Sequence, residues 1–352
     1  MKKYTLILIL FITMLGGCVI NKKLNKLESG KTFIFKKEMD KFEWYNDYLK
    51  HDFIQIDYPN ENKPNKYLFE IGGRLLRDNA LSFNHKFSCT SCHNPNYNFA
   101  DTSLYAYKNA NSNKNLNLNT PSLTNLGYQK YFGNEGKYTN LENYILMHIS
   151  DKNIMNIKEE ELLERLNSNK NYLDLLAESG LSKEYNKDIV SNALGQYIRS
   201  LSSIFSSIEL ELRNKNMIDK SDREIIAYFG YKYTPKVIST IALCTKCHSS
   251  IAYGGVVVTN NGTTINGDQI KVPGIKNIAF SAPYMHDGRF KTLEEVIEYY
   301  NKGIVYNKNL DPLLLDSIGN PIRLQLSKEE VKQLSNFLKD LTDTEYLNFH
   351  KN

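Results

Sequence analysis

Two copies of one short motif constrain this chain more than any other feature of its sequence. FSCTSCHNP spans residues 87–95 and LCTKCHSS spans residues 243–250. Each copy holds two cysteines three positions apart, with a histidine directly after the second. The chain has five cysteines, and the fifth is Cys18. Because the other four all belong to the two motifs, no thiols remain for a general disulfide framework.

The pattern C-x-x-C-H is the attachment signal for c-type haem, in which two thioethers hold the porphyrin and the histidine is an axial ligand of the iron. Other interpretations use the same residues. A thioredoxin-like pair needs a βαβ setting, which this helical sequence lacks. One zinc held by four thiolates is disfavoured by a separation of 155 positions (244 − 89). A third alternative is that each pair forms a disulfide after export. We expect two covalent haems, on Cys89, Cys92 and His93, and on Cys244, Cys247 and His248.

The N-terminus has the form of a targeting segment. Lys2 and Lys3 precede the apolar run YTLILILFITML, and Gly16, Gly17 and Cys18 follow it. This run is too short to span a membrane comfortably, and its flanks suit a cleaved signal peptide. The ending LGGC resembles a bacterial lipobox, which implies cleavage before Cys18 and lipidation of its thiol. We therefore expect a lipoprotein on the periplasmic side of a bacterial membrane; a plain secretory signal with an incidental cysteine is the alternative.

Composition and periodicity indicate a globular, mainly α protein. Hydrophobic residues make up 41% and charged residues 24% of the chain, and the net charge of +5 is not gathered into a basic patch, which argues against a nucleic-acid partner. Thr292 with Glu295 and Ser327 with Glu330 form capping-box patterns, and residues 186–201 have helical periodicity. Residues 254–259, GGVVVT, suit a short strand.

The spacing of the motifs suggests two domains of similar kind, each carrying one haem. We divide the chain into a signal peptide, a polar tether and lead-in, a first domain and a second domain. A charged connector is expected near residues 211–221. The predicted bounds are residues 1–17, 18–65, 66–210 and 211–352.

Several further segments, in order and at suitable spacing, resemble the bacterial di-haem cytochrome c peroxidase and MauG family over residues 66–347. They are IGGRLLRDNALS (71–82), NFAD (98–101), NTPSLTN (119–125), KVPGIKNIAFSAPYMHDGRFKTLEEV (271–296) and LSKEEVKQLSNFLKDLTD (326–343). The resemblance implies two cytochrome c-like domains with a calcium ion between them. It also implies that the C-terminal haem takes in electrons or holds oxidising equivalents, and that the N-terminal haem reacts with hydrogen peroxide.

The resemblance also assigns ligands. For calcium, the implied ligands are the Asn119 side chain and the backbone carbonyls of Ser281 and Pro283. The second axial ligand of the C-terminal haem falls on Tyr300, which is the MauG-type arrangement and favours high oxidation states. Met285 and Tyr299 are rival ligands, whereas His286 and Arg289 are expected to serve haem propionates and loop structure.

The peroxide-handling stretch departs from the family pattern at four positions. The family's tryptophan, arginine, glutamine and glutamate positions read Asn134, Lys137, Tyr144 and Ile154. Isoleucine cannot replace the glutamate as general acid or base. Loss of the tryptophan weakens electron passage between the haems, and its candidate replacements are Tyr131, Phe132 and Tyr144.

His148 follows Tyr144 by four positions on an expected helix, which places the two side chains on one face. We therefore expect His148 to face the open side of the N-terminal haem, as proton donor or sixth ligand. A solvent-facing histidine is the alternative interpretation. His85 and His51 are weaker candidates.

Three functions fit these observations. The first is a peroxidase that reduces hydrogen peroxide with electrons from a small cytochrome or another periplasmic donor. The second is MauG-like oxidation of a protein or organic substrate, which Tyr300 favours. The third is a membrane-tethered electron-transfer cytochrome, which the lost glutamate and tryptophan favour. The resemblance also raises the expectation of a homodimer.

Overall fold

The computed structural model describes residues 56, 58–102, 118–217, 222–248, 257–264 and 266–351. They all fall within one compact unit that extends over residues 51–352. The predicted signal peptide, Cys18 and His51 lie outside the described residues. Within the described ranges, no helix is both long and apolar enough to cross a membrane.

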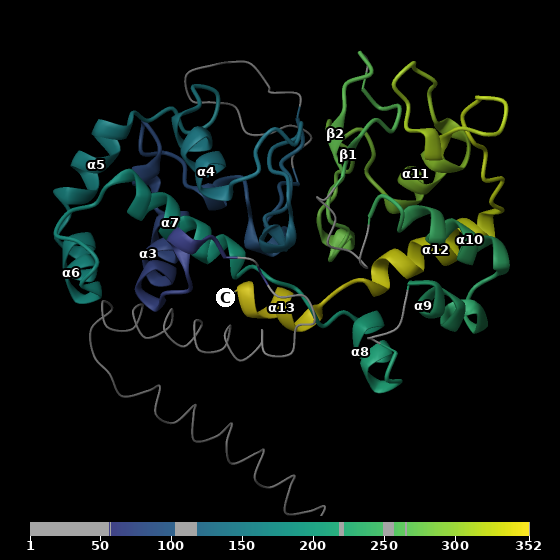
Figure 1. Cartoon of the computed structure of the whole chain (residues 1–352), viewed down its shortest axis with the longest axis horizontal. Coiled ribbons are helices and arrows are strands. Elements are labelled where there is room, and N and C mark those ends of the chain that lie inside the picture. The colour runs from purple at the N-terminus through teal and green to yellow at the C-terminus, as the bar shows by residue number, and fades with distance from the viewer. Residues whose placement is uncertain are drawn as a thin grey trace, which may run out of the picture. The chain divides into compact units, whose positions relative to one another are not determined.

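Among the described residues, five helices build the half of the fold that carries the first motif (Figure 1). Helices α3 and α7 pack closely, because a Cβ on Gly72 would lie only 1.9 Å from the carbonyl oxygen of Ala193. Only glycine fits at such a close approach. The five helices are α3 (Lys66–Arg77), α4 (Leu141–Ser150), α5 (Glu159–Asn167), α6 (Lys170–Ser179) and α7 (Lys187–Arg199).

Helix α4 is fixed to α7 by a buried ion pair. Arg199 on α7 donates to both carboxylate oxygens of Glu142 on α4. Asn62 donates a further hydrogen bond of 2.6 Å to the same carboxylate. Breaking such a pair from one side leaves an uncompensated buried charge, which costs about 3–5 kcal/mol. The pair therefore sets the position of α4, the helix that carries Tyr144 and His148.

The half that carries the second motif is also helical, with one small antiparallel sheet. Val258 pairs with Lys271 in that sheet, and Thr259 pairs with Ile270. The elements are α8 (Ser207–Asn214), α9 (Asp222–Tyr228), α10 (Pro235–Cys244), β1 (Val258–Thr259), β2 (Ile270–Lys271), α11 (Leu293–Glu298), the π-helical turn η8 (Tyr299–Gly303) and α12 (Lys328–Asp340). Short 3-10 turns occur at Asn60–Asn62, Asn79–Leu81, Cys89–Ser91, Pro95–Tyr97, Leu126–Tyr128, Phe229–Tyr231, Ile278–Phe280 and Pro312–Leu314.

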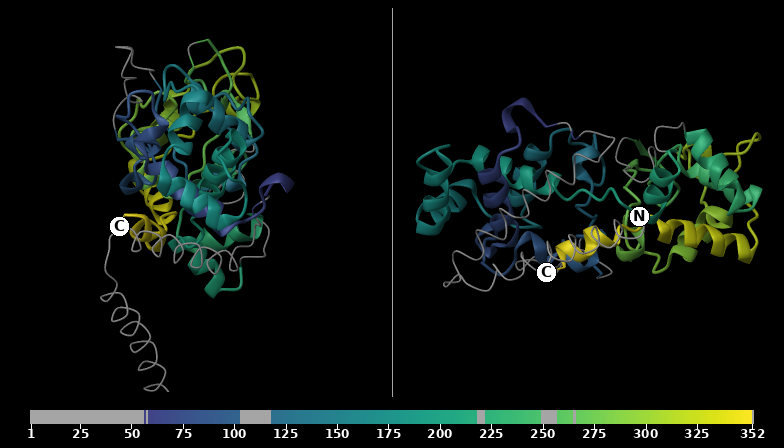
Figure 2. Two further views of the ribbon diagram at one scale, coloured as in Figure 1. Left: turned by 90° about the vertical axis from the view of Figure 1, so that its left-hand side faces the viewer. Right: turned by 90° about the horizontal axis from the view of Figure 1, so that it is seen from below.

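The last helix, α13 (Thr344–His350), returns to the first half of the fold, beside the turn Pro95–Tyr97 (Figures 1 and 2). The hydroxyl groups of Tyr346 and Thr124 share a hydrogen bond of 2.9 Å. Just before the helix, the Asp343 carboxylate accepts hydrogen bonds from the backbone of residues 204 and 205 at 3.0 and 2.8 Å. The predicted boundary between the two domains at residue 210/211 stays a prediction. Because α13 follows the second half in sequence but packs on the first, it links the two halves.

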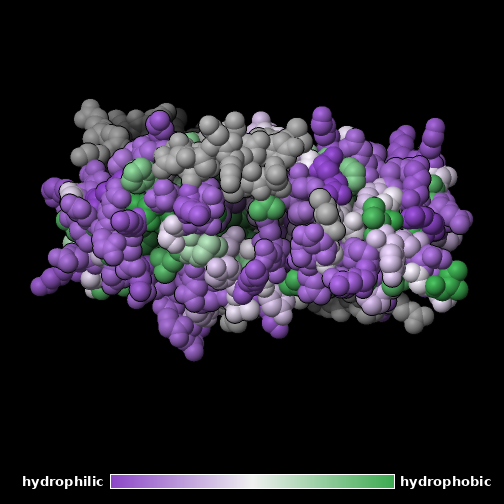
Figure 3. Space-filling view, turned by 90° about the horizontal axis from the view of Figure 1, so that it is seen from above, coloured by the Kyte–Doolittle hydropathy of each residue, from purple (hydrophilic) through white to green (hydrophobic). Residues whose placement is uncertain are grey.

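The mainly α class is confirmed, and so are several local predictions. Both capping-box patterns that the structure describes form as expected, at the starts of α11 and α12. The periodic stretch 186–201 is α7, and β1 forms the end of the predicted strand. Helix α8 continues into the expected connector as far as Asn214, so the first residues of that connector are helical. Figure 3 shows a mainly hydrophilic face on which apolar side chains lie in small, separate groups.

Candidate functional site

The first motif folds into a single tight turn. Cys89 begins a 3-10 turn, and the backbone N–H of His93 donates to the carbonyl oxygen of Cys89 at 2.8 Å. The His93 side chain is buried, and its Nδ1–H donates to the carbonyl oxygen of Phe99 at 3.1 Å. Since a carbonyl can only accept, this bond places the proton on Nδ1 and leaves Nε2 free for a metal. The motif therefore fits an axial ligand of haem iron.

His148, from α4, lies across from His93. The two ring centroids are 6.3 Å apart. Two imidazoles on opposite sides of one metal ion need about 6 Å, because each metal–nitrogen bond is about 2 Å and each ring adds about 1 Å. The Nδ1 atom of His148 is buried and has no hydrogen-bond partner in the described structure. Burial, with the nearby His93, lowers the pKa of His148 to about 4, so the imidazole is neutral and able to bind a metal. The pair fits one iron atom.

Tyr144 packs directly on His148, with ring centroids 5.6 Å apart, and Tyr138 packs on Tyr144 at 5.2 Å. Burial raises the pKa of Tyr144 to about 12, so its hydroxyl stays protonated. The structure thus brings together three sequence-predicted residues of the first haem site: His93, His148 and Tyr144.

The other three departures from the family pattern are placed differently. Lys137 is exposed and pairs with the neighbouring carboxylate of Glu135. Ile154 is partly buried in the turn after α4, where its N–H donates to the carbonyl oxygen of Asp151 at 2.9 Å. The Asn134 carbonyl oxygen accepts from the backbone N–H of Lys271 at 2.8 Å. None of the three offers a group that handles a proton at His93.

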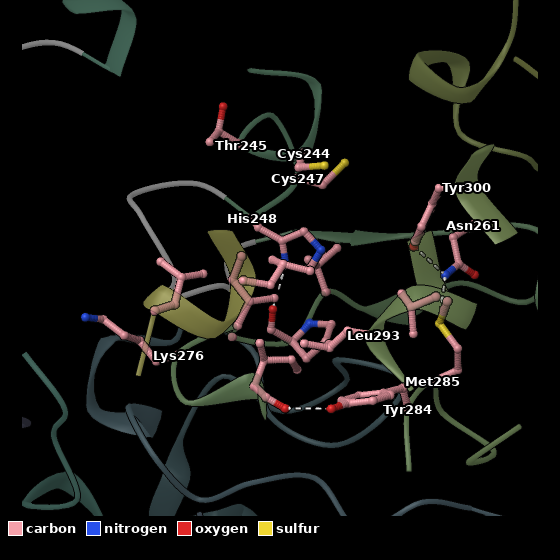
Figure 4. A pocket seen from close by; sticks show the side chains of 18 of the residues that line it. Cys244, Thr245, Cys247, His248, Asn261, Lys276, Tyr284, Met285, Leu293 and Tyr300 are labelled. Carbon is pink, nitrogen blue, oxygen red and sulfur yellow. Dashed lines mark hydrogen bonds between the residues drawn. The ribbon is translucent and has the colours of Figure 1, made fainter. Parts of the chain in front are cut away.

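The second motif closes in the same way at the end of α10. The backbone N–H of His248 donates to the Cys244 carbonyl oxygen at 2.9 Å, and its Nδ1–H donates to the carbonyl oxygen of Pro273 at 2.9 Å. A cavity adjoins the motif, and Tyr300 and Met285 lie together on its other side (Figure 4). This histidine has the same tautomer as its counterpart in the first motif.

Tyr300 and Met285 share one amide neighbour. The Asn261 side chain donates to the Tyr300 hydroxyl at 3.0 Å and lies 3.9 Å from the Met285 sulfur. Burial raises the pKa of Tyr300, and the Asn261 bond acts against that rise. The Tyr299 hydroxyl instead donates to the Asn261 carbonyl oxygen at 2.9 Å, and its ring packs on Phe290. The arrangement favours Tyr300 or Met285 over Tyr299 as iron ligand.

A partly buried cation also lines this cavity. The Lys271 amine donates to the Gln129 side-chain oxygen at 2.5 Å, and burial lowers its pKa to about 8. No carboxylate in the described part of the chain compensates this charge. Haem carries two propionates, so a cation here fits the group. Arg289 instead pairs with Asp287 and donates to the Thr263 carbonyl oxygen at 2.7 Å, in keeping with the role in loop structure expected of it.

The predicted calcium ligands lie where the two halves meet. The Asn119 side-chain nitrogen lies 2.5 Å from the Pro283 carbonyl oxygen, while its side-chain oxygen is buried without a partner. Rotating this amide by half a turn would direct two oxygens at one point, which is what calcium binds. The Ser281 hydroxyl donates to the Ile278 carbonyl oxygen at 3.2 Å. No cluster of three or more His, Cys, Asp or Glu side chains exists within the described ranges, so the amide and carbonyl oxygens are the candidate donors.

Sequence reasoning missed Lys271, Gln129 and Asn261. Lys271 opens a segment that resembles the family, but its partner Gln129 lies 142 positions away. Asn261 is 39 positions from Tyr300. Nothing in local patterning marks such pairs, and only a family alignment could have drawn attention to them.

The fold and the two motifs define a mainly helical protein with two c-type haem attachment sites, one in each half. Residues 66–216 match the family model described as di-haem cytochrome c peroxidase. This match and the named relatives confirm the resemblance to the di-haem cytochrome c peroxidase/MauG family, and those relatives are oxidoreductases.

Named relatives agree. The chain is 25% identical over 266 residues to methylamine utilization protein MauG of Methylorubrum extorquens. The aligned region covers 70% of this chain and 72% of that protein. The chain is 22% identical over 342 residues to cytochrome-c peroxidase IdrP2 of Denitromonas iodatirespirans, which covers 81% and 84%.

Solved structures share the fold. A MauG-like protein associated with microbial copper homeostasis has a TM-score of 0.68 at 22% identity, covering 84% of this chain and 96% of that one. The diheme peroxidase BthA of Burkholderia thailandensis has a TM-score of 0.60 at 18% identity, covering 81% and 88%.

Proposed function

We propose that the chain is an exported di-haem peroxidase that reduces hydrogen peroxide at the haem of His93. The observation that carries the proposal is His148, whose imidazole lies across from His93 at a ring separation of 6.3 Å. Peroxide cleavage needs a side chain there that moves a proton. In an electron-transfer cytochrome the same imidazole would serve only as a second iron ligand, and reaction with peroxide separates the two functions.

Haem iron, when bound by His93, supplies the electrons that split the peroxide O–O bond. The chain supplies the proton handling. Neutral His148 accepts a proton from one peroxide oxygen and returns it to the departing oxygen, which leaves as water. It thereby takes over the task that Ile154 cannot perform. The ring separation also suits His148 as a second residue that would hold the haem iron.

Electrons are proposed to enter at the haem of His248 and to pass to the haem of His93. The donor is a small cytochrome or another periplasmic carrier. Tyr300 favours a second candidate function, MauG-like oxidation of a protein or organic substrate, because a phenolate ligand stabilises ferric and higher states. A tethered electron-transfer cytochrome is the third candidate.

Several finer features belong to the same proposal. Cleavage before Cys18 would leave a lipidated thiol that anchors the chain on the periplasmic side of the membrane. Calcium would be held by Asn119 with the carbonyl oxygens of Ser281 and Pro283. A homodimer is the expected assembly, by analogy with the family.

Stopped-flow mixing of the oxidised and the reduced protein with hydrogen peroxide tests the function. We expect a spectral change at the haem of His93 and turnover when a reduced small cytochrome is present. His148→Ala should change both the spectrum of that haem and the rate of its reaction with peroxide.

His85→Asn is the matched control, because His85 is exposed and has a φ of 57°, a conformation that asparagine tolerates. A wild-type protein with no spectral change and no turnover would reject both enzymatic functions and favour electron transfer. An unchanged spectrum and rate in His148→Ala would reject the role of His148 alone.

A further inference from the structure

Four aromatic rings form an uninterrupted series in the first half of the fold. It begins at His93 and continues through His148, Tyr144 and Tyr138, with centroid separations of 6.3, 5.6 and 5.2 Å. Tyr138 is partly exposed. The series therefore joins the first haem ligand to the protein surface.

The local backbone is built to allow this contact. Phe132 and Tyr138 form an antiparallel bridge, with the Phe132 N–H donating to the Tyr138 carbonyl oxygen at 2.8 Å. Between them, Gly133 has a φ of +79°, and a Cβ there would lie 3.3 Å from the Tyr144 ring. Glycine supplies both the backbone conformation and the space for the ring. The Tyr138–Tyr144 contact is thus a product of the loop and not of two flexible side chains.

Packing alone would also account for such a stack, since an aromatic pair contributes about 0.5–1.5 kcal/mol beyond its buried area. Its position argues for more. Tyrosine is a side chain that gives up one electron together with its phenolic proton, and two tyrosines lie in series beside His148.

We propose that Tyr144 and Tyr138 form a redox relay through which phenolic donors at the surface supply electrons, one at a time, to the first haem site. This inference rests on the proposed function, because hydrogen peroxide is the oxidant. A phenol suits the site because electron and proton exchange between two phenols is almost balanced in free energy.

The stoichiometry balances over two transfers. Each of two phenol molecules loses one electron and one proton and becomes a phenoxyl radical. Peroxide takes up the two electrons and two protons, its O–O bond breaks, and two waters form. At Tyr138 the proton passes to solvent. At Tyr144 the nearby Asp151 carboxylate, whose charge acts on both Tyr144 and His148, is available to take the proton.

Rapid-freeze-quench EPR of the two-haem protein after mixing with peroxide tests the relay directly. We expect a tyrosyl radical whose spectrum narrows when the protein is made with ring-deuterated tyrosine. Tyr144→Phe should abolish that radical. Tyr138→Phe should leave a radical on Tyr144.

The donor is tested with tyramine coupled to dextran, a phenol too large to enter the protein. The oxidation rate of this phenol is divided by the rate of peroxide consumption that the same protein shows with a reduced small cytochrome as donor. This ratio should fall at least tenfold in Tyr138→Phe. Tyr231→Phe is the control: Tyr231 is 68% exposed, in the other half of the fold, and should leave radical and ratio unchanged.

The outcomes separate the two ideas. If the wild type consumes peroxide with the cytochrome donor but shows no tyrosyl radical, or keeps its phenol ratio in Tyr138→Phe, the relay is overturned and the peroxidase stands. If the wild type does not react with peroxide at all, both are overturned. Since Tyr→Phe keeps the packed ring, unchanged haem spectra in both variants confirm that they have folded.

Discussion

The two C-x-x-C-H motifs of this protein are alike on the side of the histidine and unlike on the opposite side. In both, the histidine N–H closes the turn on the first cysteine, and Nδ1–H donates to a backbone carbonyl, of Phe99 in one half and Pro273 in the other. Across from them, the first site presents an imidazole and the second presents a phenol and a thioether. On the near side, the turn from the first cysteine to the histidine is fixed by local chain geometry. The far side comes from other segments, from α4 in the first half and from η8 and the loop at Met285 in the second, and these segments can differ.

This difference assigns different work to the two sites. A neutral imidazole at the first site can exchange protons with a bound oxygen species. A phenol hydrogen-bonded to Asn261 at the second site cannot do so readily, because burial raises its pKa, but it would stabilise oxidised iron if Tyr300 is the ligand, as we propose. The comparison predicts one reactive and one electron-storing haem, and the following changes test it.

Removing one pair of thiols has the largest expected effect. Cys89→Ser with Cys92→Ser should reduce covalent haem from two per chain to one, because neither thioether can form. The matching double substitution, Cys244→Ser with Cys247→Ser, should remove the other haem. Mass spectrometry of the unfolded protein counts the haems. Two haems retained in either variant would contradict the assignment of that motif.

Tyr300→Phe should change the second site alone. Loss of an oxygen ligand is expected to raise the midpoint potential of that haem by on the order of 100 mV, since axial ligands dominate haem potentials. Low-temperature EPR and a redox titration measure the change.

Tyr299→Phe is the matched control, because it removes the hydrogen bonds of that hydroxyl with the backbone of Asn261 and Val305 and leaves the Tyr300 hydroxyl in place. If Tyr300→Phe leaves the spectrum unchanged and Met285→Leu alters it, the ligand is the thioether and the two sites differ less than proposed.

Calcium removal should affect the contact between the sites. Chelation is expected to lower the unfolding temperature of the wild type, because a ligand present at 100 times its dissociation constant stabilises by about 2.7 kcal/mol. Asn119→Ala should have the lower temperature already and should not respond to calcium. Asn143→Ala, an exposed position on α4, is the control and should still respond. Equal responses in all three proteins would rule out Asn119 as a ligand.

Lys271→Met should have the smallest effect, again at the second site. A positive charge at about 10 Å would destabilise an oxidised haem iron by about 1–2 kcal/mol, so its removal should lower the potential by roughly 40–90 mV. Lys236→Met removes an exposed lysine and should cause little change. A change in the midpoint potential of the first haem and not of the second would contradict the placement of Lys271 at the second site.

Local chemistry explains how far the sequence could predict this molecule. Haem attachment follows from three neighbouring residues, and capping boxes mark the starts of α11 and α12. His148 could be nominated because helical spacing links it to Tyr144. In contrast, the Lys271–Gln129 bond joins residues 142 positions apart, and no periodic pattern carries that information.

The return of α13 was beyond prediction for the same reason. Its Tyr346 bonds to Thr124 across 222 positions, and the short helix has no local signal that names its partner. The resemblance to the family was enough to identify the four positions at which this sequence differs from the family pattern. Only the structure shows that Tyr144 and His148 are in contact and that Lys137 is exposed.

The position of α13 has a consequence for the order in which the protein is assembled. His350 packs edge-on against Phe99, at 5.3 Å between ring centroids, and the carbonyl of Phe99 orients the buried His93. Helix α13 follows every other described helix along the chain, so it is synthesised after them. The environment of His93 is therefore completed only once residue 350 has been made, and a chain that stops before α13 would leave that environment unfinished.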